Sequence, residues 1–251
     1  EKGIDFQNIA IRYFHERILY RISLSTYKDN LWLKGGNWIY ATQDINSRPT
    51  TDIDVLAQAM KNDEAMVTSI FKEILSIDAE DGISFMLHEI KSSIIAEQRQ
   101  YHGIRLTLIA TLDTIRQSIM IDVGFGDVVT PAPIQIDFPV LLHTMPVPNL
   151  WAYNAETVIA EKFHAMVSLG SINSRMKDVF DIYTILMTYT LDRENLRNAI
   201  HATFEIRNTP LDSDAIIFTM DYRNDPNKER QWQQYHKKLK MENDVTFAQV
   251  V

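Results

Sequence analysis

The amino-acid sequence predicts an α/β protein in which a mixed β-sheet flanked by helices is followed by a helical domain. Two observations lead to this fold class. Through residues 4–125, stretches of helical periodicity alternate with short apolar runs that are typical of strands. After a segment with five prolines between residues 128 and 151, only helical periodicity follows. We therefore expect a sheet domain over residues 1–145 and a helical domain over residues 146–251.

The first part contains two amphipathic helices and several strands. Helices are expected, from apolar residues at helical spacing, over residues 4–25 and 63–77. Strands are expected, from short apolar runs, over residues 31–33, 52–57, 83–96, 104–112 and 117–125. The connection at residues 37–50 should hold a short helix and a loop. The last three strands are separated by hairpin-length segments, which favours antiparallel pairing between them.

The second part begins after the proline-rich segment, which has room for one short edge strand over residues 134–137. Asn154 is a favourable N-cap for a helix over residues 155–169. Further helices are expected, from their periodicity, over residues 175–189, 192–207 and 212–222. The polar tail from residue 223 should end in one more helix.

Composition excludes several classes of protein. The 251 residues are 45% hydrophobic and 23% charged, which is ordinary for a globular protein. No cysteine is present, so a disulfide framework, a thiolate metal site and a catalytic thiol are excluded. The net charge of −8 argues against a basic coat for nucleic acid, although a local basic groove stays open. Without a membrane span or signal-peptide pattern, we expect a cytoplasmic protein with no membrane partner.

Two aspartates in the second strand need a physical reason. Asp is depleted in strands, yet Asp52 and Asp54 flank Ile53 in an apolar run and so point to one face of the strand. Two such charges repel unless a cation lies between them, and Mg²⁺ is the simplest cation for carboxylate oxygens. The pair Gly35-Gly36, after the first strand, is a turn that could bring backbone N–H groups close to phosphates.

Asp122 is the third carboxylate of interest. It lies late in the run 119–123 and faces away from Ile121 and Val123. If this strand pairs near the second strand, three carboxylates converge, and Asp122 could orient or deprotonate an attacking hydroxyl. The alternative is that Asp122 caps the glycine-rich turn after it, and both interpretations stay open. We expect Asp127 to be a turn residue.

A second polar cluster lies in the helical part. Asp178 and Asp181 share a helix face, with Arg175 and Lys177 within reach for surface ion pairs. The alternative is that these residues line a site for a triphosphate and its metal. Lys162 has apolar neighbours that already supply the buried stripe of its helix, so we expect its ammonium group at the rim of a cleft, where it suits a phosphate.

Taken together, these motifs resemble those of the AbiEii/AbiGii toxin family of nucleotidyltransferases. Five motifs occur in the order of that family, between residues 33 and 183: Lys34-Gly35-Gly36, residues 48–54, residues 121–127, residues 161–165 and residues 175–181. The resemblance implies catalytic roles for Asp52, Asp54, Asp122 and Lys162, the first three as metal ligands. It implies nucleotide binding by Gly35, Gly36, Arg48, Thr51, Lys162, Arg175, Asp178 and Asp181. Lys177 stands where the family usually has Arg, and Lys lacks the bidentate geometry of Arg.

The resemblance also implies a function. It implies a nucleotidyltransferase-like sheet and transfer of a nucleotide from an NTP to an acceptor hydroxyl, with Mg²⁺, or Mn²⁺ in its place, as the cofactor. It further implies the toxin of a bacterial toxin–antitoxin pair, a cognate antitoxin as partner and RNA, such as tRNA, as acceptor. Two alternatives stay open: an inactive module that binds nucleotide and a partner, and a metal-dependent phosphohydrolase. Lys237, Lys238 and Lys240 form a short basic patch that could contact RNA or simply end a solvated helix.

Overall fold

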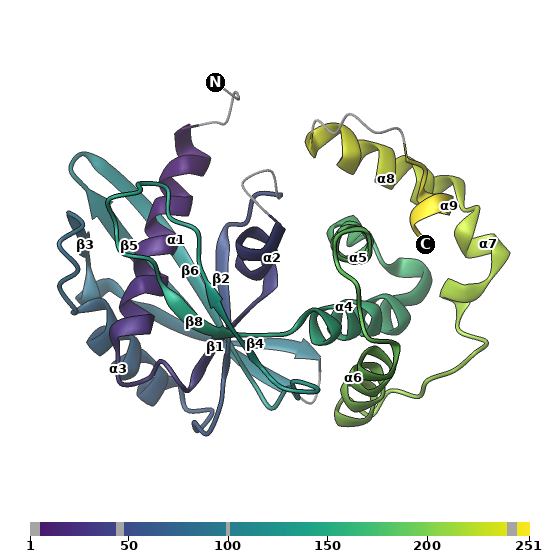
Figure 1. Cartoon of the computed structure of the whole chain (residues 1–251), viewed down its shortest axis with the longest axis horizontal. Coiled ribbons are helices and arrows are strands. Elements are labelled where there is room, and N and C mark those ends of the chain that lie inside the picture. Colours follow the sequence, from purple (N-terminus) through teal and green to yellow (C-terminus); the bar gives the residue numbers. More distant parts are fainter. Residues whose placement is uncertain (1–5, 44–47, 99–100, 240–244) are drawn as a thin grey trace. The chain divides into compact units, whose positions relative to one another are not determined.

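A computed structural model describes residues 6–43, 48–98, 101–239 and 245–251 of the chain (Figure 1). Its contacts group the chain into two compact units. Unit 1 comprises residues 1–127 and 133–153, and unit 2 comprises residues 128–132 and 154–251. The domain boundary expected after residue 145 stays a prediction.

Unit 1 is built on one mixed β-sheet. Its eight strands are β1 (Leu31–Lys34), β2 (Asp52–Ala57), β3 (Ile83–Phe85), β4 (Lys91–Gln98), β5 (Tyr101–Leu112), β6 (Ile115–Phe125), β7 (Ile134–Asp137) and β8 (Asn149–Ala152). Their order is β3-β5-β6-β2-β1-β8-β7, and β4 also pairs with β5. The β2–β6 and β1–β8 pairs are parallel, and the other pairs are antiparallel.

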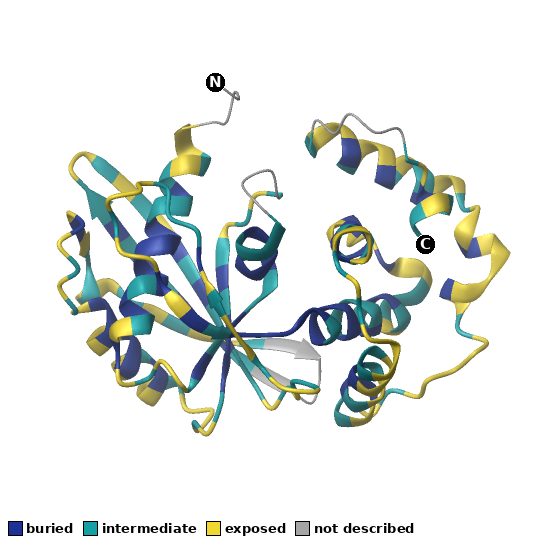
Figure 2. Ribbon diagram, in the orientation of Figure 1, coloured by how far each residue is buried: buried dark blue, intermediate teal, exposed yellow. Residues whose placement is uncertain are grey.

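Three helices accompany this sheet: α1 (Phe6–Leu24), α2 (Gly35–Gln43) and α3 (Glu64–Leu75). The central strands alternate between buried and half-buried residues, as Figure 2 shows. The buried set includes Ile53, Val55, Ile121 and Val123, each at most 1% exposed. The half-buried face carries the aspartates. Burying one face makes the strand register specific, because a slip of one residue would place these aspartates in the core.

Unit 2 is helical. Its α-helices are α4 (Ala155–Leu169), α5 (Met176–Thr188), α6 (Arg193–Ile206), α7 (Met220–Arg223), α8 (Pro226–Leu239) and α9 (Phe247–Val250). Short 3₁₀ helices lie at Leu87–Glu89 in unit 1 and at Gly170–Ile172 and Ile216–Phe218 in unit 2. Asn154 caps α4 by accepting a hydrogen bond from the backbone N–H of Thr157, at 2.7 Å.

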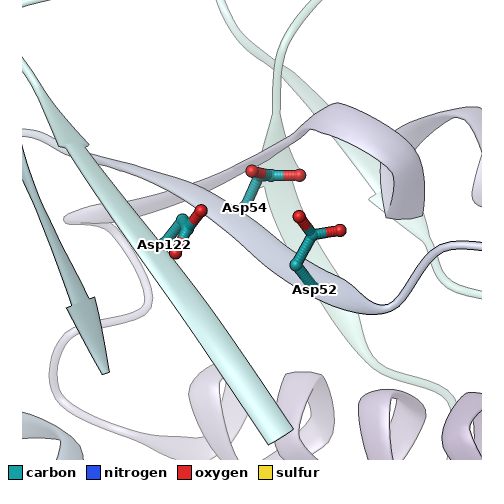
Figure 3. A group of neighbouring side chains, drawn as sticks. All are labelled: Asp52, Asp54 and Asp122. Carbon is teal, nitrogen blue, oxygen red and sulfur yellow. The ribbon is translucent and has the colours of Figure 1, made fainter. Parts of the chain in front are cut away.

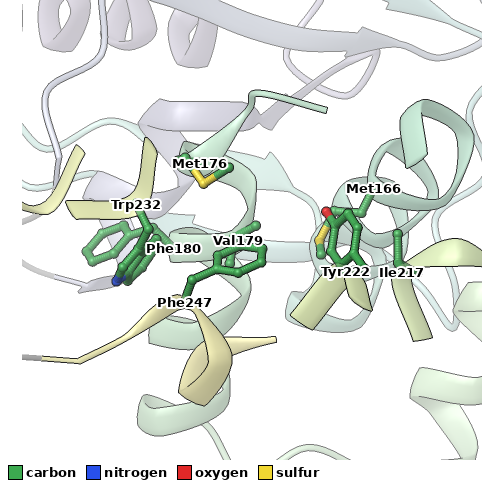
Figure 4. Packing of buried hydrophobic residues seen from close by; sticks show 8 residues of the cluster. All are labelled: Met166, Met176, Val179, Phe180, Ile217, Tyr222, Trp232 and Phe247. Atoms are coloured by element: carbon green, nitrogen blue, oxygen red, sulfur yellow. The ribbon is translucent and has the colours of Figure 1, made fainter. Parts of the chain in front are cut away.

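An apolar cluster packs the C-terminal segments of unit 2 against α4 and α5 (Figure 4). Its buried members are Met166, Met176, Val179, Phe180, Ile217, Tyr222, Trp232 and Phe247. They come from α4, α5, the 3₁₀ helix at Ile216–Phe218, α7, α8 and α9, so residues far apart in sequence share one core. This core fixes α8 beside α5, because Trp232 of α8 packs against Phe180 of α5 with ring centroids 6.4 Å apart.

The expected fold class is confirmed, with local differences. The strand expected over residues 83–96 is wrong in detail, because a 3₁₀ helix divides it into β3 and β4. The helix expected over residues 212–222 is also wrong, since only the 3₁₀ helix at Ile216–Phe218 and the one-turn α7 form there. The edge strand at residues 134–137 is confirmed as β7, whereas β8 was not foreseen. In the described part of the chain, none of the helices has the length and apolar character that crossing a bilayer requires.

Candidate active site

Four charged residues form one row across the sheet of unit 1. Lys34 of β1 is paired with Asp54 of β2, Asp54 with Asp122 of β6, and Asp122 with Arg105 of β5. Residues that are directly paired between neighbouring strands point to the same face. The row therefore presents two carboxylates side by side, with a cation at each end.

Asp52 adds a third carboxylate on the same face. It lies two residues before Asp54 on β2, as the alternation of a strand requires. One oxygen from each of Asp52, Asp54 and Asp122 lies within 4.8 Å of the others. Figure 3 shows the three side chains converging from β2 and β6. The parallel pairing of these strands brings together the three aspartates predicted from the sequence.

Arg105 holds the outer carboxylate of this group. Its Nε donates to Asp122 Oδ1 at 2.7 Å, and its Nη2 donates to Oδ2 at 2.6 Å. The hydrogen bond to Asp122, together with the charges of Asp122, Asp52 and Asp54, raises the pKa of Arg105 above its usual value. Among the described residues Asp122 thus accepts from a guanidinium, and not from the turn after it as the capping interpretation expected. Its catalytic role stays a prediction.

Lys34 is the cation at the other end of the row. Its Nζ donates to Asp127 Oδ2 at 2.7 Å, and the hydroxyl of Tyr153 donates to the same oxygen at 3.2 Å. The ammonium group also lies 5.1 Å from the centroid of the Tyr153 ring. Asp127 is therefore more than the turn residue that was expected, because it anchors Lys34.

Gly35 and Gly36 open helix α2 instead of forming a free-standing turn. Gly35 has a φ of +65°, and a Cβ atom at this position would lie 2.0 Å from Asp54 Oδ2. A Cβ atom on Gly36 would lie 2.3 Å from Thr50 Oγ1. A larger residue at position 35 would collide with Asp54, and one at position 36 would collide with Thr50, so both positions require glycine. The first N–H groups of a helix lack an intrahelical acceptor, so this end of α2 suits an anion.

A chain of hydrogen bonds from neighbouring residues holds Asp52 in place. Thr50 Oγ1 donates to Asp52 Oδ1 at 2.9 Å, and Asn37 Nδ2 donates to the backbone carbonyl of Asp52 at 2.8 Å. Asn37 Oδ1 in turn lies 3.3 Å from Nδ1 of His15 in α1. His15 is buried, and burial lowers its pKa to about 4, so the ring is neutral near pH 7. These contacts fix the position of β2 relative to α1 and α2.

The predicted nucleotide-binding residues near this site differ in exposure. Arg48 is half-buried, and its Nη1 lies 3.4 Å from the position that a Cβ atom on Gly36 would occupy. Thr51 is exposed, whereas its neighbour Thr50 makes the contact with Asp52. The roles of Arg48 and Thr51 stay predictions.

The second predicted cluster forms within unit 2. Lys162 Nζ of α4 lies 3.1 Å from Asp178 Oδ1 and 2.6 Å from Asp181 Oδ2 of α5. The Lys162 side chain is 11% exposed, and those of Asp178 and Asp181 are 8% and 0% exposed. Of the two interpretations of Asp178 and Asp181, surface ion pairing is therefore wrong. Both aspartates are buried, and both pair with Lys162.

The carboxylates of unit 1 match a divalent metal in their chemistry. Asp52, Asp54 and Asp122 offer only oxygen atoms, which Mg²⁺ and Mn²⁺ prefer. These three carboxylates carry three negative charges, and the cations at the ends of the row, Lys34 and Arg105, carry two positive charges. The net charge of the five side chains is therefore −1, without Asp127. Asp52 and Asp54 are the two that could hold such an ion without competition from Arg105, because both oxygens of Asp122 already accept from its guanidinium.

Comparison with known proteins identifies the family. The family model described as nucleotidyl transferase AbiEii toxin, type IV toxin–antitoxin system, matches residues 17–251. The chain belongs to the AbiEii family of nucleotidyltransferases. A search of the curated proteins gave no match. Membership confirms the resemblance seen in the motifs and establishes the protein as a nucleotidyltransferase.

One solved structure supports this fold, and two further ones are similar over a large part of the chain. JHP933 from Helicobacter pylori is 14% identical, with 95% of each chain covered and a TM-score of 0.52. An antigenic nucleotidyltransferase-like protein from Paracoccidioides brasiliensis is 13% identical, with 76% of this chain and 88% of that chain covered and a TM-score of 0.41. The antibiotic-resistance factor ANT(2'')-Ia is 15% identical, with 80% and 93% covered and a TM-score of 0.40. At such identities the likeness to JHP933 concerns the fold alone.

Two residues at the site of this AbiEii protein were missed in the sequence, although a signal was present. Arg105 is a charged residue inside an apolar strand, as Asp122 is. Leu112 pairs with Ile115 across a two-residue turn, and this register places Arg105 opposite Asp122. Lys34 was read only as part of the glycine motif, although it ends β1 directly opposite Asp54.

Proposed function

We propose that this AbiEii family member transfers a nucleotide from an NTP to a hydroxyl group of RNA, in a reaction that depends on Mg²⁺ or Mn²⁺. One observation carries the proposal. Three carboxylates converge within 4.8 Å, and the glycine start of α2 lies directly against one of them. Phosphoryl transfer requires carboxylates that bind a metal and, beside them, N–H groups that bind the phosphates.

Asp52 and Asp54 are the proposed metal ligands. Thr50 and Asn37 hold Asp52, and Gly35 leaves no free space beside Asp54, so both carboxylates are positioned before ligands arrive. When bound, the metal supplies charge neutralisation for the phosphates and polarises the phosphorus that is attacked. Asp122, held by Arg105, completes the set of three carboxylates.

The proposed step forms one bond and breaks one. The acceptor oxygen bonds to the α-phosphorus, the bond from this phosphorus to the oxygen bridging toward the β-phosphate breaks, and pyrophosphate leaves. The hydroxyl proton passes to Asp122, whose carboxylate faces the site beside Asp54. Arg105 keeps Asp122 oriented and stays charged throughout, since its pKa is raised.

The NTP is bound by further residues in this proposal. The backbone at Gly35 and Gly36 binds phosphate, with Arg48 and Thr51 nearby in sequence. Lys162 binds the nucleotide as a point charge, and Asp178 and Asp181 position its ammonium group. Arg175, which precedes α5, is assigned to a phosphorylated ligand as well.

The proposed biological role follows from the family. We propose that the chain is the toxin of a toxin–antitoxin pair, acting on RNA such as tRNA in the cytoplasm and counteracted by a separately encoded antitoxin. Expression of the chain alone should then arrest bacterial growth, whereas a D52A/D54A variant should not. Arrest by the double variant would show that toxicity comes from binding, in favour of the inactive-module alternative.

A labelling experiment separates the alternatives. The protein is incubated with total RNA, Mg²⁺ and each of the four NTPs labelled at the α-phosphate. Label on RNA together with released pyrophosphate supports the proposal. Release of inorganic phosphate without labelled RNA would indicate a phosphohydrolase, and retention of intact NTP alone would indicate a binding module.

A further inference from the structure

Unit 2 has a hollow at its surface between the start of α5 and α8, which we name the α5–α8 pocket. Its volume is about 410 Å³, which is within the range of small-ligand sites. The side chains that matter for its chemistry are Arg175, Lys177, Gln231, Gln234, Tyr235 and Lys238. Among the described residues that line it, three are cationic and none is acidic.

The pocket is held in shape by contacts beneath it. Lys228 of α8 donates to the backbone carbonyls of Ser171 (2.7 Å) and Asn173, which ties the loop before α5 to α8. Asn173 Oδ1 then accepts from the backbone N–H of Arg175 at 2.8 Å. On the other wall, Tyr235 packs edge-on against Phe180, with ring centroids 5.9 Å apart. The walls are thus fixed without a ligand, which lowers the entropic cost of binding one.

The charge of the pocket differs from that of the whole protein. The chain carries a net charge of −8, yet Arg175, Lys177 and Lys238 gather around this hollow without a lining carboxylate. Like charges held close together repel, and a phosphate group relieves this repulsion through charge-assisted hydrogen bonds. The ligand class that fits is therefore a phosphorylated one.

The remaining lining groups fit a base. Gln231 Oε1 is buried and has no hydrogen-bond partner among the described residues, so turning its amide into the hollow to accept from a ligand N–H group would satisfy this oxygen. Gln234 brings an amide and Tyr235 an aromatic ring to the same hollow. Amides that bond base edges and rings that stack on bases are typical of proteins that bind single-stranded RNA.

We propose that the α5–α8 pocket binds a nucleotide of the acceptor RNA, with Lys177 and Lys238 contacting its backbone phosphates and Gln231 its base. This inference rests on the proposed function, because it supplies the binding surface for the RNA acceptor. A free NTP carries the same chemical groups, so the experiment has to separate the two sources. Catalysis itself is assigned to other residues.

The test compares two double variants of equal charge. K177A/K238A removes two exposed lysines of the pocket, and R230A/K237A removes two exposed cations of α8 that do not line it. Affinity for a short fluorescein-labelled single-stranded RNA is measured by anisotropy at several salt concentrations, and affinity for ATP by calorimetry. Thermal melts check that both variants fold.

For K177A/K238A we expect RNA affinity to fall on the order of tenfold and the salt slope to become shallower by about 0.7 per lost contact. ATP affinity should not change, and R230A/K237A should bind RNA nearly as the unmodified protein does. Equal losses in both variants would indicate diffuse electrostatics and overturn the inference, as would unchanged RNA binding. Loss of ATP affinity with RNA binding intact would assign the pocket to the donor NTP and also overturn it.

Transfer assays on the same variants separate this inference from the proposed function. Pocket-dependent RNA binding by a protein that transfers no nucleotide would uphold the pocket and refute the proposed function. Undiminished transfer to RNA by K177A/K238A at limiting RNA would refute the pocket and leave the proposed function intact.

Discussion

Arg105 and Asp122 lie directly opposite each other in β5 and β6, and the guanidinium donates to both oxygens of the carboxylate. The pair is partly open to solvent, with the Arg105 side chain 38% and that of Asp122 17% exposed. Arg105 thus neutralises part of the carboxylate cluster and competes with any cation for Asp122. Its removal should separate these two effects.

Arg105→Met should tighten Mn²⁺ binding on the order of tenfold, because a positive charge next to the site is lost. Mn²⁺ titration followed by electron paramagnetic resonance measures this directly, without catalysis. Arg116→Met is the control, since Arg116 lies on the adjacent strand β6 in a loose pair with Glu89 at 3.5 Å. Weaker Mn²⁺ binding by Arg105→Met would show instead that Arg105 positions Asp122 as a ligand.

Gly35→Ala should abolish transfer while leaving the protein folded. The added methyl group would occupy the position of the Asp54 carboxylate, at 2.0 Å from Oδ2, so Asp54 must move. Gly82→Ala is a matched control, because Gly82 also has a positive φ, of +74°, but a Cβ atom there would only approach Leu112 Cδ1 at 3.2 Å. Both variants should lose about 1 kcal/mol of stability from the backbone strain. Equal activity of the two would contradict the role of Gly35.

Lys162→Met should both destabilise unit 2 and weaken NTP binding. Lys162 is the cation shared by two buried carboxylates, and removing one partner of a buried ion pair costs about 3–5 kcal/mol. The triple variant K162M/D178N/D181N removes all three charges and should regain stability. If Lys162 binds phosphate, the triple variant should still bind NTP weakly in a calorimetric titration. Recovery of NTP affinity together with stability would limit Lys162 to a structural role.

His15 should make stability depend on pH. Its pKa is about 4 in the folded chain, against 6.5 when it is free of the fold, because burial disfavours the charged ring. The unfolded chain therefore takes up the proton first, so this stability is fully present above pH 6.5 and is lost as the pH falls toward 4. The difference is worth about 3 kcal/mol. Urea unfolding between pH 7.5 and 4.5 should show a shallower pH dependence for His15→Gln than for His88→Gln, whose ring is exposed. Identical pH dependence in the two variants would contradict this prediction.

Much of the site could be predicted because its signals are local. Aspartates inside apolar strands mark a polar face whatever the tertiary structure, so Asp52, Asp54 and Asp122 stood out. The N-cap Asn154 and the bounds of α4 and β2 likewise follow from residues that are close in sequence.

Other features depend on contacts between distant segments. The sequence suggested a phosphate-facing role for Lys162 but not its ion pairs, because the two carboxylates that hold it lie 16 and 19 positions away. Asn37 and His15 gain their role only when α1 and α2 meet β2. The helix expected over residues 212–222 gave way because Ile217 and Tyr222 pack into the core of unit 2 from shorter segments. Periodicity alone does not encode such packing.

Nucleotide transfer by an Asp54→Asn variant tests the central proposal most directly. This change removes the charge of one proposed metal ligand with little change in shape. Asp113→Asn makes the same chemical change at an exposed turn residue with a φ of +51°, a conformation that Asn tolerates. With α-labelled NTPs, Mg²⁺ and RNA, we expect labelled RNA from the unmodified protein and from Asp113→Asn, and none above background from Asp54→Asn. Labelled RNA at an undiminished rate from Asp54→Asn would contradict the assignment of the active site to these carboxylates.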